Sequence, residues 1–233
     1  MLDEIAERSF RRNAIMFVLD SVGFLAGLAV LGPTTILPAL VRQLGGGPQV
    51  VGLLSAIQAG GYTLPQLIAG RYLANRAHVR RQVVLLATLS RLFLLLMVPA
   101  LALWAVTAPG LALWALVVAF GGFCIIDSLS VVGWFDLMGK AVPQDRRGRL
   151  MGAGQSLASL AGIGAGLLVR QLLARQQAFP SSYVLIILLA WAILALCPAA
   201  LALVKERPAA LHCSEQLSWR QYLPQLSSIL RQD

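Results

Sequence analysis

The sequence alternates between long apolar runs and short polar stretches. An α-helix needs about 20 mostly apolar residues to cross the hydrocarbon core of a bilayer. Six runs reach that length, so we predict an all-α membrane protein with six transmembrane helices. Residues 1–13 are predicted to be a cytoplasmic N-terminus, and residues 14–204 to form one six-helix domain. The predicted membrane helices cover residues 14–41, 50–74, 83–106, 111–135, 150–173 and 182–204.

The stretch after the last run, residues 205–233, has a different pattern. Apolar residues recur there at helical spacing while polar residues occupy the other faces, and Pro224 interrupts the series. Such an amphipathic stretch typically lies along a membrane surface. We therefore interpret 205–233 as the start of a cytoplasmic loop. The apolar residues of the stretch are Trp219, Leu223, Leu226 and Leu230.

Composition and charge support the membrane interpretation. The chain is 58% hydrophobic and 12% charged, against roughly 25% charged in soluble domains. A net charge of +9 is also typical of nucleic-acid-binding proteins, but here the basic residues lie between apolar runs, as the positive-inside rule requires. We therefore expect the lipid bilayer, and no nucleic acid, as a partner, with both termini in the cytoplasm. Fifteen basic residues fall on the cytoplasmic side (Arg8, Arg11, Arg12, Arg71, Arg76, Arg80, Arg81, Lys140, Arg146, Arg147, Arg149, Lys205, Arg207, Arg220, Arg231), three on the other (Arg42, Arg170, Arg175), and Arg91 lies inside a run.

Three charged residues interrupt the apolar runs, where a charge is costly and usually functional. They are Asp20, Arg91 and Asp127, in the first, third and fourth runs. At about 1.5 Å per residue, all three lie about 10–13 Å in from the same side. Two interpretations remain open: Arg91 neutralises one acid and fixes helix packing, or Asp20 or Asp127 faces a cavity and binds substrate or a proton. Neutral polar residues that could line the same cavity are Gln58, Gln66, Ser128, Ser130, Gln155 and Ser156.

The fifth run is rich in small residues. Gly154, Gly162 and Gly166 recur there, and small residues let membrane helices approach closely. They indicate either simple close packing or a sliding contact between the helices of a transporter.

Sequence patterns of enzymes and of metal or cofactor sites do not occur in the chain. Its three cysteines and two histidines lack the spacing of zinc ligands. The nucleotide-binding and hydrolase motifs are also missing. We therefore expect a protein that is not an enzyme and has no cofactor and no metal. Any transport must then draw on a gradient or run downhill.

A short basic stretch, Asp136–Gly152, separates the fourth and fifth runs, and we predict a tight cytoplasmic hairpin there. Within it, Pro143 is followed by Arg147, Gly148 and Arg149. This order resembles the loop after helix 4 of major facilitator superfamily transporters.

The stretch after the second run resembles the family's loop between helices 2 and 3. In the family, a glycine, an acid and several arginines follow one another in this loop, which helps to gate the cytoplasmic side. Here the acid is replaced by Asn75, which puts the usual charge relay in doubt. The resemblance makes Arg76, Arg80, Arg81, Arg147, Gly148 and Arg149 candidates for gating.

The resemblance covers nearly the whole chain and implies the N-terminal six-helix half of a secondary transporter, built as a 3+3 inverted repeat. It implies a permease or exporter of the bacterial inner membrane that moves a small solute by alternating access, with protons as a candidate coupling ion. Because the family has twelve helices, the chain resembles a fragment whose partner is the missing C-terminal half or a second copy. The alternative is a non-transporting membrane scaffold, or a half-transporter that needs a partner.

Overall fold

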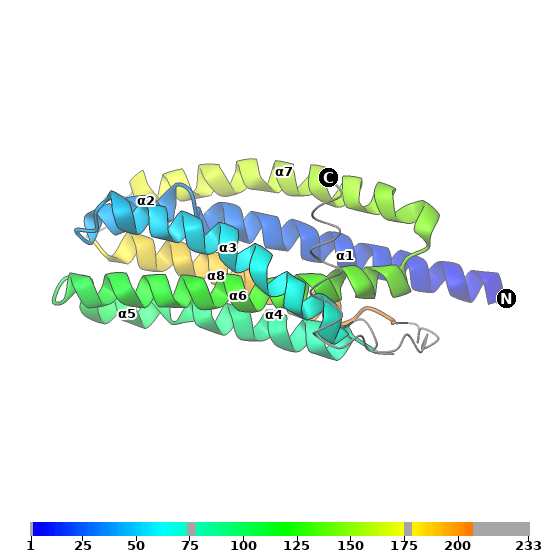
Figure 1. The fold of residues 1–233 in the computed structure, drawn as a ribbon. Helices are drawn as coiled ribbons and strands as arrows, with labels where there is room; N and C mark the ends of the chain where they lie inside the picture. Colours follow the sequence, from blue (N-terminus) through cyan, green and yellow to red (C-terminus); the bar gives the residue numbers. More distant parts are fainter. Residues whose placement is uncertain (1, 74–77, 175–178, 207–233) are drawn as a thin grey trace, which may run out of the picture.

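The computed structural model describes residues 2–73, 78–174 and 179–206. These residues form one elongated bundle of helices that run up and down along a common direction (Figure 1). The predicted amphipathic stretch after residue 206, with Trp219 and Leu223, lies outside the described residues. The helices are α1 (Leu2–Leu31), α2 (Ile36–Gln43), α3 (Pro48–Leu73), α4 (Arg80–Leu95), α5 (Met97–Trp104), α6 (Pro109–Ala141), α7 (Gln144–Ala174) and α8 (Ser181–Ala202).

Five helical stretches among the described residues are long and apolar enough to cross a membrane, and the prediction of a multi-pass membrane protein is confirmed to that extent. α3 covers the second predicted run and is 26 residues long, which is sufficient for a crossing. Its apolar sequence is interrupted by Gln58, Tyr62 and Gln66. The five stretches are Ser9–Gln43, Arg80–Trp104, Pro109–Ala141, Gln144–Ala174 and Ser181–Ala202.

The first apolar run is longer and more broken than predicted. α1 begins at Leu2, so most of the predicted N-terminal tail is helical and the helix does not start at residue 14. The run then breaks at Gly32, whose φ of 54° lies in the left-handed region that favours glycine. Pro33 follows directly, and α2 restarts at Ile36.

Two further boundaries differ from prediction. The third run is interrupted at Leu96, between α4 and α5, because Pro99 has no amide hydrogen to donate to the preceding turn. The predicted hairpin over Asp136–Gly152 is much shorter, since α6 continues to Ala141 and α7 starts at Gln144. The basic residues of that stretch therefore belong to the ends of two helices.

Packing divides the bundle into two groups of helices. α1 packs mainly against α7 and α8, α6 packs mainly against α3 and α4, and α4 joins the groups through α8. The closest approaches occur at glycines: a Cβ on Gly27 would lie 2.6 Å from Leu194 Cγ, and one on Gly122 would lie 2.2 Å from Phe93 Cδ1. These contacts lock α1 onto α8 and α6 onto α4.

The glycines predicted to pack α7 behave differently from one another. A Cβ on Gly154 would lie 3.4 Å from Ser21, so this glycine does face α1. Gly162 lies against Ala29 at 4.0 Å, the limit of contact, and Gly166 faces open space. Among the described residues, Gly154 therefore lies against α1, whereas Gly166 has no neighbour, and the packing role of the three glycines stays a prediction.

Candidate functional site

An ion pair lies at the centre of the bundle. From the sequence it was undecided whether Arg91 pairs with an acid, and with which one. Arg91 on α4 donates through Nη1 to Asp127 Oδ1 on α6, and both side chains are buried. Of the two acids that Arg91 could have paired with, the structure selects Asp127. The ion pair joins two helices that already pack closely.

Asp127 has more partners than Arg91 alone. Tyr62 on α3 donates its hydroxyl to Asp127 Oδ2 at 2.8 Å. Ser90 Oγ accepts from Arg91 Nη1 at 2.6 Å and lies 3.2 Å from Asp127 Oδ1 and 2.8 Å from the Ala87 carbonyl. Both carboxylate oxygens therefore have hydrogen-bond donors, as a buried charge requires.

The guanidinium of Arg91 is equally well held. Its Nε lies 3.4 Å from the carbonyl of Leu194 on α8 and donates to it. Its planar head lies over the rings of Phe24 and Phe123, 5.4 Å and 5.7 Å from their centroids. Stacking on aromatic faces stabilises a desolvated guanidinium. Arg91 thus connects α1, α4, α6 and α8.

Asp20 on α1 has a much simpler environment. It is 7% exposed, and its Oδ2 accepts a hydrogen bond of 2.7 Å from Trp134 Nε1 on α6. Among the described residues, no cationic side chain forms a salt bridge with it. Asp20 is therefore a buried acid with one neutral partner.

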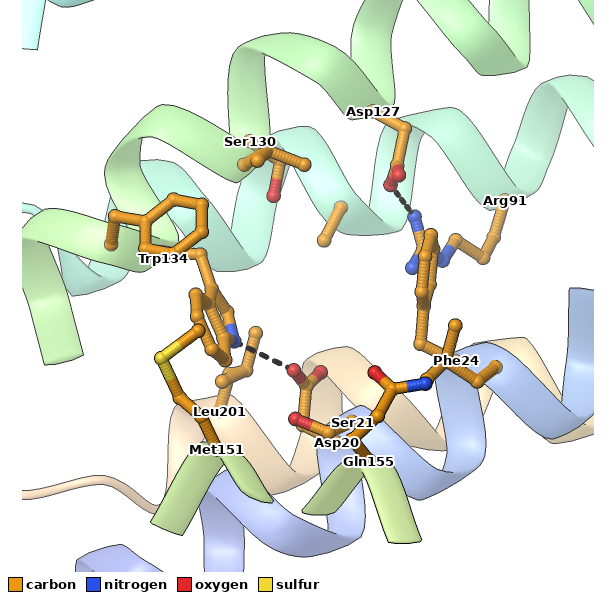
Figure 2. A pocket seen from close by; sticks show the side chains of 14 residues that line it. Asp20, Ser21, Phe24, Arg91, Asp127, Ser130, Trp134, Met151, Gln155 and Leu201 are labelled. Carbon is orange, nitrogen blue, oxygen red and sulfur yellow. Dashed lines mark hydrogen bonds and ion pairs between the residues drawn. The ribbon is translucent and has the colours of Figure 1, made fainter. Parts of the chain in front are cut away.

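Asp20 and the Arg91–Asp127 pair line the same cavity, of about 250 Å³. Figure 2 shows the two bonded pairs, Asp20–Trp134 and Arg91–Asp127, at different ends of the group of lining side chains. Helix α7 contributes Met151 and Gln155. Most of the other lining side chains are apolar, among them Phe24, Leu25, Val131, Phe135 and Leu201.

The predicted cavity residues divide into those the structure brings together and those it does not. Asp20, Arg91, Asp127, Ser130 and Gln155 line the cavity. Ser128 donates to the Ile125 carbonyl of its own helix. Gln58, Gln66 and Ser156, whose side chains are half-buried or exposed, are not among its lining residues.

Sequence reasoning missed three residues of the network: Tyr62, Ser90 and Trp134. Ser90 could have been found, because it directly precedes Arg91. Tyr62 and Trp134 carry no such signal, since an aromatic residue in an apolar run is usually packing. Only the three-dimensional arrangement identifies them as hydrogen-bond donors to buried acids.

The N-terminus and the α6–α7 connection lie at the same end of the bundle (Figure 1), and the basic residues Arg12, Arg80 and Arg147 belong to segments at that end. Arg147 folds back to donate to the carbonyls of Val142 at 3.1 Å and Gly139 at 2.6 Å, and so covers the C-terminus of α6. Arg81, Gly148 and Arg149 are exposed, whereas Arg76 lies outside the described residues.

A set of hydrogen bonds at this end, which we call the basic-end clamp, holds the segment that follows α8. It consists of Arg12, Asn13, Arg80 and Glu206. Asn13 bonds to the carbonyls of Ala141 and Lys205 and accepts from the Lys205 amide. The guanidinium groups of Arg12 and Arg80 donate to carbonyls of residues 203 and 204 at 2.8 Å each.

Glu206 supplies the acid of the clamp. Its carboxylate accepts from the amides of Val79 at 2.7 Å and Arg80 at 3.1 Å, at the start of α4. A carboxylate is favoured there because free amides point out of a helix N-terminus. His78 and Lys140 lie 3.7 Å and 4.0 Å from it. The sequence analysis identified neither Glu206 nor Asn13.

Comparison with known proteins gives no family for the chain, so its function is inferred from the site. No protein-family model matches the chain, and no curated protein or solved structure matches it either.

Proposed function

We propose that the chain is the N-terminal six-helix half of a secondary transporter of the major facilitator type, a permease or exporter that moves a small solute by alternating access. One observation carries the proposal: a cavity deep in the bundle contains a buried acid, Asp20, without a salt-bridge partner among the described residues. A charge inside a membrane bundle is costly and marks a substrate or ion pathway. The neighbouring Arg91–Asp127 pair gives the cavity a fixed polar wall.

The packing pattern supports the 3+3 arrangement. If α3 also crosses the membrane, the chain has six spans. The first three are then α1–α2, α3 and α4–α5, and the last three are α6, α7 and α8. In an inverted repeat, α1 corresponds to α6, α3 to α7, and α4 to α8. The contacts of α1 with α7 and α8 then correspond to contacts of α6 with α3 and α4, and these are the main contacts of α6. Three spans reverse the direction of the chain, so the sets have opposite orientation, as in inverted-repeat transporters.

The distribution of charge supports an orientation with the clamp end in the cytoplasm, and hence both termini there. A bacterial inner membrane fits the family resemblance. In this orientation Arg80, Arg81, Arg147 and Arg149 lie at the cytoplasmic entrance, and we assign them to the gate. Arg76, outside the described residues, is assigned to the gate from the family resemblance alone. The exposed small residues of α7, such as Gly164 and Gly166, leave room for the C-terminal half or a second copy.

A second candidate function is a membrane scaffold that does not transport. The saturated bonding of Arg91 and Asp127 favours it, because a pair of that kind needs only a structural role. Under this interpretation the cavity is a packing defect and Asp20 is only a hydrogen-bond acceptor for Trp134.

Proton flux distinguishes the two functions. The full-length gene product is reconstituted in liposomes with an imposed pH gradient, and lumenal pH is followed while pooled solutes are added. We expect solute-dependent proton movement in the wild type and none in Asp20→Asn, with Asp136→Asn as the matched control outside the cavity. Flux that survives Asp20→Asn would contradict the assignment of Asp20, and well-folded protein without flux for any pool would favour the scaffold.

A further inference from the structure

We infer that the cavity binds a monovalent organic cation with an apolar body, and that Asp20 holds its charge. The inference deepens the proposed transport function by naming the substrate class, but its test measures binding and does not depend on flux.

The net charge of the cavity lining favours a cation. Three charged side chains line the cavity, Asp20, Arg91 and Asp127, and no further lysine, arginine or histidine is among its described lining residues. Arg91 and Asp127 neutralise each other in a direct ion pair. The remaining formal charge is the carboxylate of Asp20. A cavity with one uncompensated negative charge in low dielectric favours a ligand of charge +1.

The aromatic side chains beside Asp20 also favour a cation. The Trp134 indole donates to Asp20 at 2.7 Å and lines the cavity together with Phe135. The two rings meet edge to face, with centroids 5.1 Å apart. Aromatic faces attract cations, tryptophan most strongly, and quaternary ammonium ligands are recognised in this way. An ammonium group beside Asp20 would therefore have a countercharge and aromatic side chains next to it, as the position of Trp134 shows (Figure 2).

The remaining lining restricts the chemistry further. A divalent metal needs several oxygen ligands, and no cluster of three or more potential ligand side chains occurs among the described residues. A sugar needs many hydrogen-bonding groups, whereas Leu25, Val131, Met151 and Leu201 offer none. An anion would meet the charge of Asp20. Ser21, Ser130 and Gln155 are the only neutral polar residues without an aromatic ring among the described residues that line the cavity, so an ammonium group attached to an apolar body fits both the charge of Asp20 and the mainly apolar remainder.

The test uses tritiated benzyltrimethylammonium, whose permanent charge does not titrate, with the full chain in lipid nanodiscs. We expect saturable binding with a Kd below about 1 mM and no competition by benzoate, an aromatic anion of similar size. Asp20→Asn should weaken binding at least tenfold, whereas Asp20→Glu should retain most of it. Trp134→Leu should weaken it by about threefold to tenfold.

Asp136→Asn is the matched control, because Asp136 lies on α6, pairs with Lys140 at 2.8 Å and does not line the cavity. Its binding should equal that of the wild type. Absence of saturable binding to the wild type would overturn the inference, as would competition by benzoate equal to that by unlabelled cation. These two readouts use only wild-type protein, so the result does not depend on whether Asp20→Asn folds.

The outcome is separable from that of the flux experiment. Cation binding without flux would support the inference while contradicting the transport function. Solute-driven flux without cation binding would overturn the inference and leave the transport function standing.

Discussion

Asp127 and Asp20 are both buried carboxylates in the same cavity, yet their surroundings differ. Asp127 receives hydrogen bonds from an arginine and a tyrosine and lies within reach of the Ser90 hydroxyl, and its charge is cancelled. Asp20 receives one hydrogen bond from the neutral indole of Trp134. Burial of an acid alone therefore does not distinguish a structural role from a functional one. The number and charge of its partners do.

Breaking the Arg91–Asp127 pair should have the largest effect. Arg91→Ala leaves Asp127 buried without a countercharge, and we expect the free energy of unfolding to fall by about 3–5 kcal/mol. Arg91→Ala combined with Asp127→Ala should cost less than Arg91→Ala alone, because no charge is then stranded. Unfolding by dodecyl sulfate in mixed micelles measures both variants. Equal losses in the single and double variants would contradict the pairing.

Helix α1, which carries Asp20, is held in place by close packing against α8. Gly27→Ala places a methyl group against Leu194, and we expect a loss of about 1–3 kcal/mol in unfolding free energy as α1 moves away from α8. Gly166→Ala on α7 meets open space and should change stability by less than about 0.5 kcal/mol. The same micelle titration measures both. If the two variants behave alike, the tight contact of α1 with α8 is not what holds α1 in place.

A smaller change tests the outer bonds of Asp127. Tyr62→Phe removes the hydroxyl that donates to Oδ2, and we expect a loss of about 1 kcal/mol in unfolding free energy. Tyr183→Phe deletes a hydroxyl in a tyrosine that packs edge to face on Phe179, far along the bundle, and serves as the control. Equal stability of wild type and Tyr62→Phe would show that this third bond is dispensable.

Asp20→Asn should have the smallest effect on stability. The amide oxygen still accepts from Trp134, and a buried charge is removed, so we expect a change of less than about 1 kcal/mol or a slight gain. Thermal unfolding followed by size-exclusion chromatography measures it. Stability unchanged while cation binding is lost would complete the contrast with Asp127. A loss as large as that of Arg91→Ala would instead give Asp20 a structural role.

The sequence predicted the spans well because apolar length is a local property. It missed the breaks at Gly32 and Leu96, where a glycine or proline effect competes with a continuous apolar run. It also placed too much of Asp136–Gly152 in a turn, because charged residues at helix ends read like loop residues. The sixth span and the family resemblance stay predictions.

For the site, residue counting predicted that Asp20, Arg91 and Asp127 share one depth, but not that their three helices meet there. Which acid Arg91 binds was not predictable, because that choice depends on how α1, α4 and α6 are rotated about their axes. The donors Tyr62 and Trp134 were missed for the same reason. The depth of a residue along a membrane helix follows from counting residues. The direction in which its side chain points around the helix axis is known only from the packed structure.

The basic-end clamp also bears on the order of assembly. The Asn13 side chain is bonded to Lys205, 192 residues later in the chain. The ribosome delivers Asn13 to the membrane early and Lys205 only after every span described here has been made. The bonds from Asn13 to Lys205 therefore form later than its bond to Ala141, and this end of the nascent bundle is not closed until α8 has been inserted.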